Sequence, residues 1–252
     1  MDDLKLGIIG LSEGNGHPYS WSAIFNGYNK KAMLNCEFPV IPKYLSLQVF
    51  PKDALIGASV THIWTQDRRL SEKIAEASLI PYVTTNFMDL VDCVDAVLLA
   101  RDDAENHLFF ASPFLKAGIP IYIDKPLAHS LEAAKRLIEM QQYDGQIFSC
   151  SALRYSESLT LSEEQRTELG TISCMIATVP KDWSRYAVHG IEAIRKLLPT
   201  DCKIQKRSKW ICKDRITVHL ELYNEIEIEI RTMGSSISPI SIDIFGSHSF
   251  KR

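Results

Sequence analysis

The residues best suited to chemistry in this sequence are Asp124 and Lys125, which stand before Pro126 at the end of an apolar run. Residues 94–100 and 119–123 are apolar runs that flank a helix-like segment, so they predict a βαβ unit with parallel strands. Ligands of parallel sheets gather outside the carboxyl ends of the strands, where Lys125 is expected. Its ammonium group can stabilise negative charge on a hydroxyl or carbonyl oxygen. The alternative interpretation is an exposed, solvated lysine.

A glycine-bearing loop, Gly10-Leu-Ser-Glu-Gly-Asn-Gly16, follows the first predicted strand at residues 4–9 and precedes a predicted helix at 19–28. Only Gly10 fits the G-x-G-x-x-G pattern, because Ser12 occupies the position of the second glycine. The N–H groups of such a loop and the positive end of the helix suit a pyrophosphate. A flexible loop with turn glycines is the alternative interpretation.

The elements that position these residues change character along the chain. Strands and helices alternate through residue 126, and a helix is expected at 131–142. Longer strands follow at 146–154, 171–178, 209–211, 215–223, 225–231 and 240–245, with one helix at 186–198. The fold class is therefore α/β, a Rossmann-type doubly wound parallel sheet followed by an α+β domain with a mostly antiparallel sheet. We expect a dinucleotide-binding domain at 1–126 and an abbreviated substrate or oligomerisation domain at 127–252.

Composition narrows the function classes. The chain has 252 residues and a net charge of -3, which argues against nucleic acid as a partner. A membrane span and a signal peptide are not expected, because no long apolar run occurs and the start is acidic, so we expect a cytoplasmic protein. The six cysteines show no C-x-x-C spacing and predict neither a metal site nor disulfides.

These motifs together resemble the Gfo/Idh/MocA oxidoreductases, over most of the chain. The similarity is carried by Gly7-Ile-Ile-Gly10, residues 94–100, His107, Ala117-Gly118, Asp124-Lys125-Pro126, Arg154-Tyr155, Leu169-Gly170 and His189. The Asp-Lys-Pro tripeptide resembles the Glu-Lys-Pro signature of that family. The resemblance implies two domains, NAD(P) as cofactor, and a sugar, cyclitol, nucleotide sugar or related compound as substrate.

The resemblance also implies roles for individual residues. Lys125 and His189 are the expected catalytic residues, with His189 exchanging the proton of the substrate oxygen; a packing or capping histidine is the alternative. The expected cofactor-binding residues are Gly10, Ser12, Gly14, Asn15, Thr65, Arg68, Asp102, His107, Asp124 and Lys125. Because Thr65 and Gln66 stand where NAD enzymes place an acid, and Arg68 can pair with a 2′-phosphate, the cofactor is NAD or NADP.

Two departures from the family pattern bear on function. Arg185 stands where relatives often have an aspartate, and an arginine can bind a carboxylate or phosphate of the substrate. Arg154, Arg185 and Tyr186 are the expected substrate contacts. The chain also ends earlier than its relatives, which bears on how its second sheet forms subunit contacts, and we expect a homodimer or higher homo-oligomer.

Two functions follow from these patterns. The first is hydride transfer between NAD(P) and a hydroxyl or keto carbon of a sugar or nucleotide sugar. The second is a dinucleotide-binding protein without turnover, serving as a sensor or assembly partner, which Ser12, Arg185 and the short carboxyl end favour. A generic α/β protein with another ligand is a third interpretation, which requires the Asp-Lys-Pro match to be coincidental.

Overall fold

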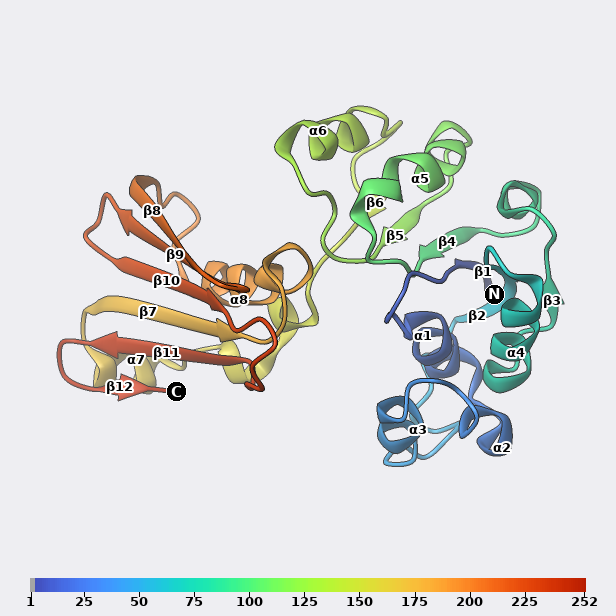
Figure 1. Ribbon diagram of the computed structural model, residues 1–252, viewed down its shortest axis with the longest axis horizontal. Helices are drawn as coiled ribbons and strands as arrows, with labels where there is room; N and C mark the ends of the chain where they lie inside the picture. The colour runs from blue at the N-terminus through green and yellow to red at the C-terminus, as the bar shows by residue number, and fades with distance from the viewer. Residues whose placement is uncertain (1–2) are drawn as a thin grey trace. The chain divides into compact units, whose positions relative to one another are not determined.

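The structure is a computed structural model that describes residues 3–252 (Figure 1). It divides into two compact units, the first ending at Ser149 and the second spanning Cys150–Arg252. Each unit has a sheet and a hydrophobic core of its own.

The first unit is built on a parallel six-stranded sheet with the order β3-β2-β1-β4-β5-β6. The strands are β1 (Leu4–Ile9), β2 (Ala58–Trp64), β3 (Tyr82–Val83), β4 (Ala96–Leu99), β5 (Ile121–Ile123) and β6 (Ile147–Phe148). The direction of winding reverses between β1 and β4, and ligands of open α/β sheets bind at such a point. This sheet confirms the Rossmann-type fold expected from the sequence.

Helices cover both faces of this sheet. They are α1 (His17–Asn26), α2 (Lys30–Met33), α3 (Val40–Leu45), α4 (Arg68–Ser78), α5 (His107–Lys116) and α6 (Leu131–Glu139). Because side chains alternate along a strand, Ile8 of β1 packs with α1 and α4, whereas Ile9 packs with α5 on the other face.

The segment between α1 and β2 carries two short helices, α2 and α3. Asn29 caps α2 through its side chain, and the chain then enters α3. Phe38 and Ile41 lie against Gly16, where an added Cβ would be 2.6 Å from Ile41 Cδ1. Gly16 is therefore required by the close approach of this segment to the start of α1.

The first unit extends beyond the expected boundary between residues 126 and 127. Helix α6 packs on α5, and β6 pairs with β5 through Ile121 and Ile147. The strand expected over 146–154 is therefore wrong in extent, because only Ile147–Phe148 is a strand and it belongs to the first sheet. Arg154 lies in a 3-10 turn, Ala152–Tyr155, which begins where the side chain of Ser151 accepts a hydrogen bond from the Leu153 N–H.

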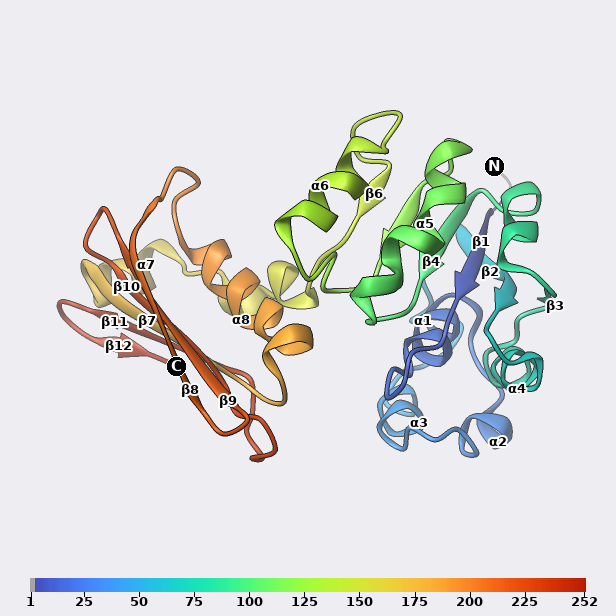
Figure 2. The ribbon, with the colours of Figure 1, turned by 45° about the horizontal axis from the view of Figure 1, so that its top comes forward.

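The second unit is a six-stranded sheet with the order β12-β11-β7-β10-β9-β8, and α8 lies along one of its faces (Figure 2). Its elements are α7 (Glu163–Leu169), β7 (Ile172–Val179), α8 (Trp183–Leu197), β8 (Ile204–Cys212), β9 (Arg215–Leu222), β10 (Glu227–Thr232), β11 (Ser241–Gly246) and β12 (Phe250–Lys251). All pairs are antiparallel except β7 with β10. Side chains alternate along β10, where Ile228 and Ile230 are buried under α8.

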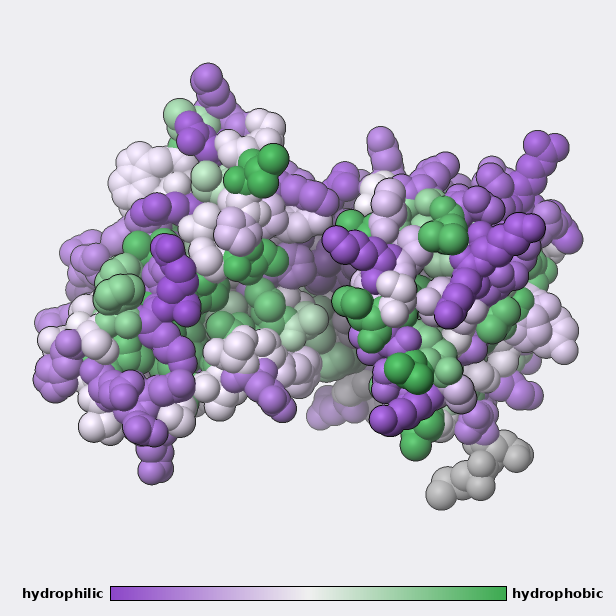
Figure 3. All heavy atoms as spheres, turned by 90° about the horizontal axis from the view of Figure 1, so that it is seen from below, coloured by the Kyte–Doolittle hydropathy of each residue, from purple (hydrophilic) through white to green (hydrophobic). Residues whose placement is uncertain are grey.

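The surface seen in Figure 3 carries small hydrophobic patches among hydrophilic side chains. Every residue of β8 is exposed, so the basic side chains of this strand, which pairs with β9, are solvated. Among residues 3–252, no helix combines the length and the apolar character needed to cross a membrane.

Candidate functional site

The carboxylate of Asp124 joins two loops at the carboxyl end of the first sheet. Its side chain is 1% exposed, and its Oδ2 accepts a hydrogen bond from Asn15 Nδ2 at 2.8 Å and lies 2.6 Å from His17 Nδ1. Its Oδ1 accepts the backbone N–H of Lys125 at 2.7 Å. The loop after β1 is thereby fixed to the end of β5, although 109 residues separate Asn15 from Asp124.

Lys125 is buried beside a second carboxylate, that of Asp102 after β4. The two residues are 8% and 7% exposed, and the Lys125 ammonium lies 3.8 Å from Asp102 Oδ2. Ser12 donates its hydroxyl hydrogen to Asp102 Oδ1 at 2.6 Å and accepts the Asp102 N–H at 3.0 Å. The structure therefore shows a buried, paired lysine at a strand end rather than a solvated one.

The loop after β1 fits a dinucleotide phosphate. Gly14 has a φ of 77°, and a Cβ placed there would meet nothing within 4 Å, so its backbone is open to a ligand. The N–H groups of Gly14 and Gly16 have no hydrogen-bond partner among the described residues. The N–H of His17 is bonded to Asn15 Oδ1 at 2.8 Å, and Pro18 has none. Backbone N–H groups of this kind suit a pyrophosphate, and the contact of this loop with the cofactor stays a prediction.

Arg101 supports this loop and was not among the predicted site residues. Its guanidinium forms a two-point contact with Asp103 at 2.9 and 2.6 Å and donates to the carbonyl oxygens of Gly10 and Leu11 at 3.3 and 3.2 Å. It also lies 4.7 Å above the centre of the Phe110 ring. The signal for it was an arginine directly after an apolar strand and before two aspartates.

The pKa of Asp103 is below its ordinary value as a result. Burial acts to raise the pKa, but the hydrogen bonds from Arg101 and Asn106 and the positive charge of Arg101 outweigh that effect. The carboxylate therefore stays charged and keeps the arginine in place.

The end of β2 uses its polar side chains within the fold. The hydroxyl of Thr65 is 2.7 Å from the Asp67 carbonyl oxygen and 2.9 Å from Ser71 Oγ. Gln66 bonds both the N–H and the carbonyl of Leu11, at 3.1 and 2.7 Å. A cofactor contact by the Thr65 hydroxyl would have to replace these hydrogen bonds within the turn, and it stays a prediction.

Arg68, which was predicted to bind the cofactor, occupies the exposed start of α4. Its Nε pairs with Glu72 at 2.9 Å, and the two side chains are 63% and 53% exposed. This exposed pair leaves the guanidinium able to exchange partners, since such pairs contribute little to stability.

His107, which was predicted to bind the cofactor, has a structural role in the first unit. It is fully buried, with Nδ1 3.0 Å from the carbonyl oxygen of Leu127 and Nε2 2.8 Å from that of Arg101. It thus joins the segment after β5 to the end of β4, and its contact with a cofactor stays a prediction.

In the second unit, His189 lies on α8 beside a buried serine. Its Nδ1 is 2.7 Å from Ser151 Oγ, and Ser151 has no exposed surface. The Tyr186 ring meets the imidazole edge to face, with the ring centres 5.4 Å apart. Lys181 Nζ donates to the Tyr186 hydroxyl at 2.5 Å. The structure thus brings His189 and Tyr186 together, and Ser151 and Lys181 are neighbours absent from the predicted site.

The two predicted arginines of the second unit differ in their surroundings. Arg154 Nε donates to Glu192 on α8 at 2.7 Å. Burial acts to lower the pKa of Arg154, but this hydrogen bond and the charge of Glu192 raise it above its ordinary value. Arg185 lies in the first turn of α8, where its N–H donates to Asp182 Oδ1 at 3.0 Å. Substrate contacts by either arginine remain predictions.

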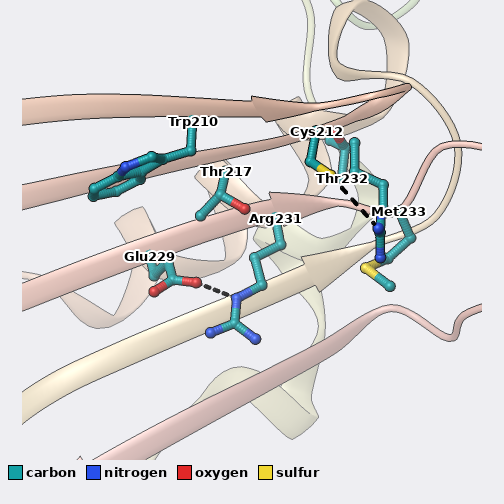
Figure 4. A pocket seen from close by; sticks show the side chains of 8 residues that line it. Trp210, Cys212, Thr217, Glu229, Arg231, Thr232 and Met233 are labelled. Atoms are coloured by element: carbon teal, nitrogen blue, oxygen red, sulfur yellow. Dashed lines mark hydrogen bonds and ion pairs between the residues drawn. The ribbon is translucent and has the colours of Figure 1, made fainter.

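The second sheet carries a cavity of about 420 Å³ that contains none of the predicted site residues (Figure 4). It opens beside β8, β9 and β10, and Figure 4 shows the Arg231 guanidinium paired with Glu229 rather than pointing free into the space. The lining residues are Trp210, Cys212, Arg215, Thr217, Glu229, Arg231, Thr232 and Met233.

No cluster of three or more potential metal ligands occurs within residues 3–252. Within residues 3–252, none of the six cysteines, from Cys36 to Cys212, is part of a disulfide.

Comparisons with known proteins agree with this arrangement. Residues 5–151 match the family model described as "Oxidoreductase family, NAD-binding Rossmann fold". The chain is 33% identical over 84 residues to "Putative oxidoreductase YceM" of Salmonella typhimurium, and the match spans 33% of this chain and 27% of that protein.

Solved structures with the same fold include two dehydrogenases. Myo-inositol 2-dehydrogenase from Lactobacillus plantarum superposes with a TM-score of 0.71 at 13% identity, over 99% of this chain and 76% of that one. Myo-inositol dehydrogenase from Lactobacillus casei, in complex with NAD(H) and myo-inositol, gives 0.70 at 16% identity, over 99% and 74%. These likenesses show the fold, and the family match covers more than half of the chain. The chain therefore belongs to the Gfo/Idh/MocA oxidoreductase family, whose first domain is an NAD-binding Rossmann fold.

Proposed function

We propose that the protein transfers a hydride between NAD(P) and a hydroxyl or keto carbon of a sugar, cyclitol or nucleotide sugar. The observation that carries the proposal is the buried Lys125 ammonium at the end of β5, beside Asp102 and next to the loop suited to phosphate. The inositol dehydrogenases of similar fold support a polyhydroxylated ring as the substrate class.

The reaction requires charge stabilisation at one oxygen. In the oxidising direction, the carbinol carbon gives its hydride to the nicotinamide while the hydroxyl proton leaves to a base, and the oxygen becomes part of a carbonyl. The Lys125 ammonium stabilises the alkoxide-like charge that develops on that oxygen. Asp102 and Asp124 hold the lysine, the first through its ammonium and the second through its backbone N–H. We also assign to His189 a hydrogen bond with the reacting oxygen of the substrate.

The experiment compares Lys125→Met with Lys116→Met, which alters an exposed lysine at the end of α5. We expect Lys125→Met to lower hydride transfer about 100- to 1,000-fold, measured by nicotinamide absorbance over a panel of cyclitols, sugars and sugar nucleotides. Dinucleotide affinity, measured by fluorescence of the reduced cofactor, should change little. Full turnover in Lys125→Met would overturn the assignment.

The second candidate function is dinucleotide binding without turnover. Its support is the substitution of Arg185 for the aspartate that relatives often carry, together with Ser12 bonded to Asp102 in the phosphate loop. Tight binding of NADH or NADPH with no hydride exchange across the panel would favour this candidate. Failure to bind either dinucleotide would contradict both functions.

We further propose that the protein forms a homodimer or higher homo-oligomer through the face of the second sheet opposite α8. Trp210 is 57% exposed on this face, and neighbouring Ile211 is 64% exposed on the other because side chains alternate along β8. Light scattering should show a smaller assembly for Trp210→Glu than for the matched variant Ile211→Glu. Equal masses for the two variants would exclude this face.

A further inference from the structure

The contact between Ser151 and His189 fixes more than the position of the imidazole ring. We infer that Ser151 holds His189 as the neutral tautomer with its proton on Nε2, so that His189 presents an N–H donor. The role of His189 in catalysis rests on the proposed function, whereas the tautomer of its imidazole does not. Ser151 is then a positioning residue that acts through His189.

A serine hydroxyl has one hydrogen to donate and two lone pairs that accept. One lone pair of Ser151 Oγ accepts the Leu153 N–H at 3.2 Å, and His189 Nδ1 is the other polar atom in reach, at 2.7 Å. If Nδ1 carried the proton, it would donate to Oγ, and the serine hydrogen would have no acceptor among the described residues.

That arrangement is costly because Ser151 is fully buried and water does not reach its hydroxyl. The serine hydrogen therefore points at Nδ1, which must offer a lone pair. The imidazolium form has a hydrogen on both ring nitrogens, so the Ser151 hydroxyl hydrogen would again lack an acceptor. Ser151 accordingly opposes a proton on Nδ1 in either form.

The ring has little freedom to escape this contact. Gly190, the next residue, lies so close to β7 that a Cβ would be 2.9 Å from the Ala177 Cβ, so α8 packs directly on the sheet at this point. The Tyr186 ring packs on the imidazole from the preceding turn of the helix. The 3-10 turn that Ser151 begins packs against the same helix. Helix, sheet and turn together keep Nδ1 facing Ser151.

A neutral imidazole that offers Nε2–H polarises a carbonyl oxygen by hydrogen bonding instead of removing a proton. The sequence assigned His189 the role of proton acceptor, and the geometry around Ser151 points to a hydrogen-bond donor. In the reducing direction of the proposed reaction, the carbonyl carbon receives the hydride, the Lys125 ammonium gives a proton to the oxygen, and His189 would donate a hydrogen bond to that oxygen.

The test is a long-range proton–nitrogen correlation spectrum of the full chain labelled with ¹⁵N-histidine. It is recorded about two pH units above the ordinary histidine pKa of about 6.5, with His189→Asn used for assignment. We expect a pyridine-like Nδ1 and a pyrrole-like Nε2 in the wild type. In Ser151→Ala, the Nδ1 resonance should shift as its hydrogen bond is lost, and Ser151→Thr should keep the wild-type resonance.

Ser162→Ala is the matched control, because Ser162 also caps a helix through its side chain but does not contact His189. It should leave the His189 resonances unchanged. A protonated Nδ1 in the wild type, or an unchanged Nδ1 resonance in a folded Ser151→Ala, would overturn the inference. If Ser151→Ala does not fold, the wild-type and Ser151→Thr spectra decide it.

The kinetic constants of Ser151→Ala provide a second, independent test of the positioning role of Ser151. Ser151→Ala should lower kcat up to about 100-fold with little change in KM, because the imidazole is free to turn from its productive position. The spectrum needs no turnover, so an inactive protein with the expected tautomer would contradict the proposed function and leave this inference standing.

Discussion

Asn15 and Asp124 share a buried hydrogen bond of 2.8 Å that joins the loop after β1 to the end of β5. The Asn15 side chain also accepts the His17 N–H, so one residue contacts both the first residue of α1 and the carboxylate next to Lys125. We expect Asn15→Ala to lower the free energy of unfolding by about 1–3 kcal/mol, because two hydrogen bonds are lost together, one of them to the buried carboxylate of Asp124. Urea unfolding measures this change.

The same substitution should weaken dinucleotide binding about tenfold, since the loop is no longer held at Asp124. Asn35→Ala is the control, because Asn35 is exposed and has no side-chain hydrogen bond among the described residues. Equal effects of the two substitutions on affinity would show that the Asn15–Asp124 contact does not shape the loop.

Replacing Arg101 by lysine should destabilise the protein. Its guanidinium bonds Asp103 at two points and two loop carbonyls while 8% exposed, and a lysine cannot reproduce that planar geometry. We expect Arg101→Lys to destabilise the protein by about 2–4 kcal/mol, because several buried acceptors lose their donor. In contrast, Arg68→Lys, which alters an exposed pair with Glu72, should change stability by less than about 0.5 kcal/mol. If Arg101→Lys also changed the free energy of unfolding by less than about 0.5 kcal/mol, Arg101 would not hold the loop after β1 in place.

Acid should remove a part of the stability that depends on Asp103. The pKa of this carboxyl is lowered in the folded protein, so its contribution is fully present above the unfolded value of about 3.9 and is lost as pH falls through the folded pKa. We expect the stability of Asp103→Asn to be lower than that of the wild type near neutral pH, and the difference to shrink below about pH 4. Unfolding measured as a function of pH tests this; a constant difference would contradict it.

The first half of the fold was predictable from sequence because local signals and long-range packing agree there. The strands at 94–100 and 119–123 are apolar on both faces, as a parallel sheet covered by helices requires. Lys125 could be placed at the carboxyl edge from its position after the strand. Its partner Asp102 was also expected near the cofactor, but the Ser12–Asp102 and Asn15–Asp124 contacts depend on loop conformations that no periodicity encodes.

The beginning of the second unit was harder to predict for a physical reason. Residues 146–154 are apolar enough for a long strand, but the Ser151 cap starts a 3-10 turn and ends the extended run. The role of Ser151 beside His189 could not be inferred either, because 38 residues separate them and α8 must pack on the sheet first.

Gly190 should be needed for the packing of α8. Replacing glycine by alanine inside a helix usually stabilises it by about 1 kcal/mol. Here the new Cβ would be 2.9 Å from the Ala177 Cβ and 3.3 Å from Val179 Cγ1, both on β7. We therefore expect Gly190→Ala to destabilise the protein by about 1–3 kcal/mol and to shift the His189 resonances. A more stable variant would show that α8 has room to move away from β7.

Arg68 should distinguish NADP from NAD. The end of β2 places Thr65 and Gln66 in contacts within the fold, so the nearby positive charge of Arg68 is the feature that can favour a 2′-phosphate. Because its pair with Glu72 is exposed, the guanidinium can leave that partner at little cost. We expect Arg68→Ala to weaken NADPH binding about tenfold and NADH binding less than twofold, and Glu72→Gln to strengthen NADPH binding modestly. Fluorescence titration of both reduced cofactors measures these changes, and equal losses for the two would assign Arg68 to the solvated surface of α4.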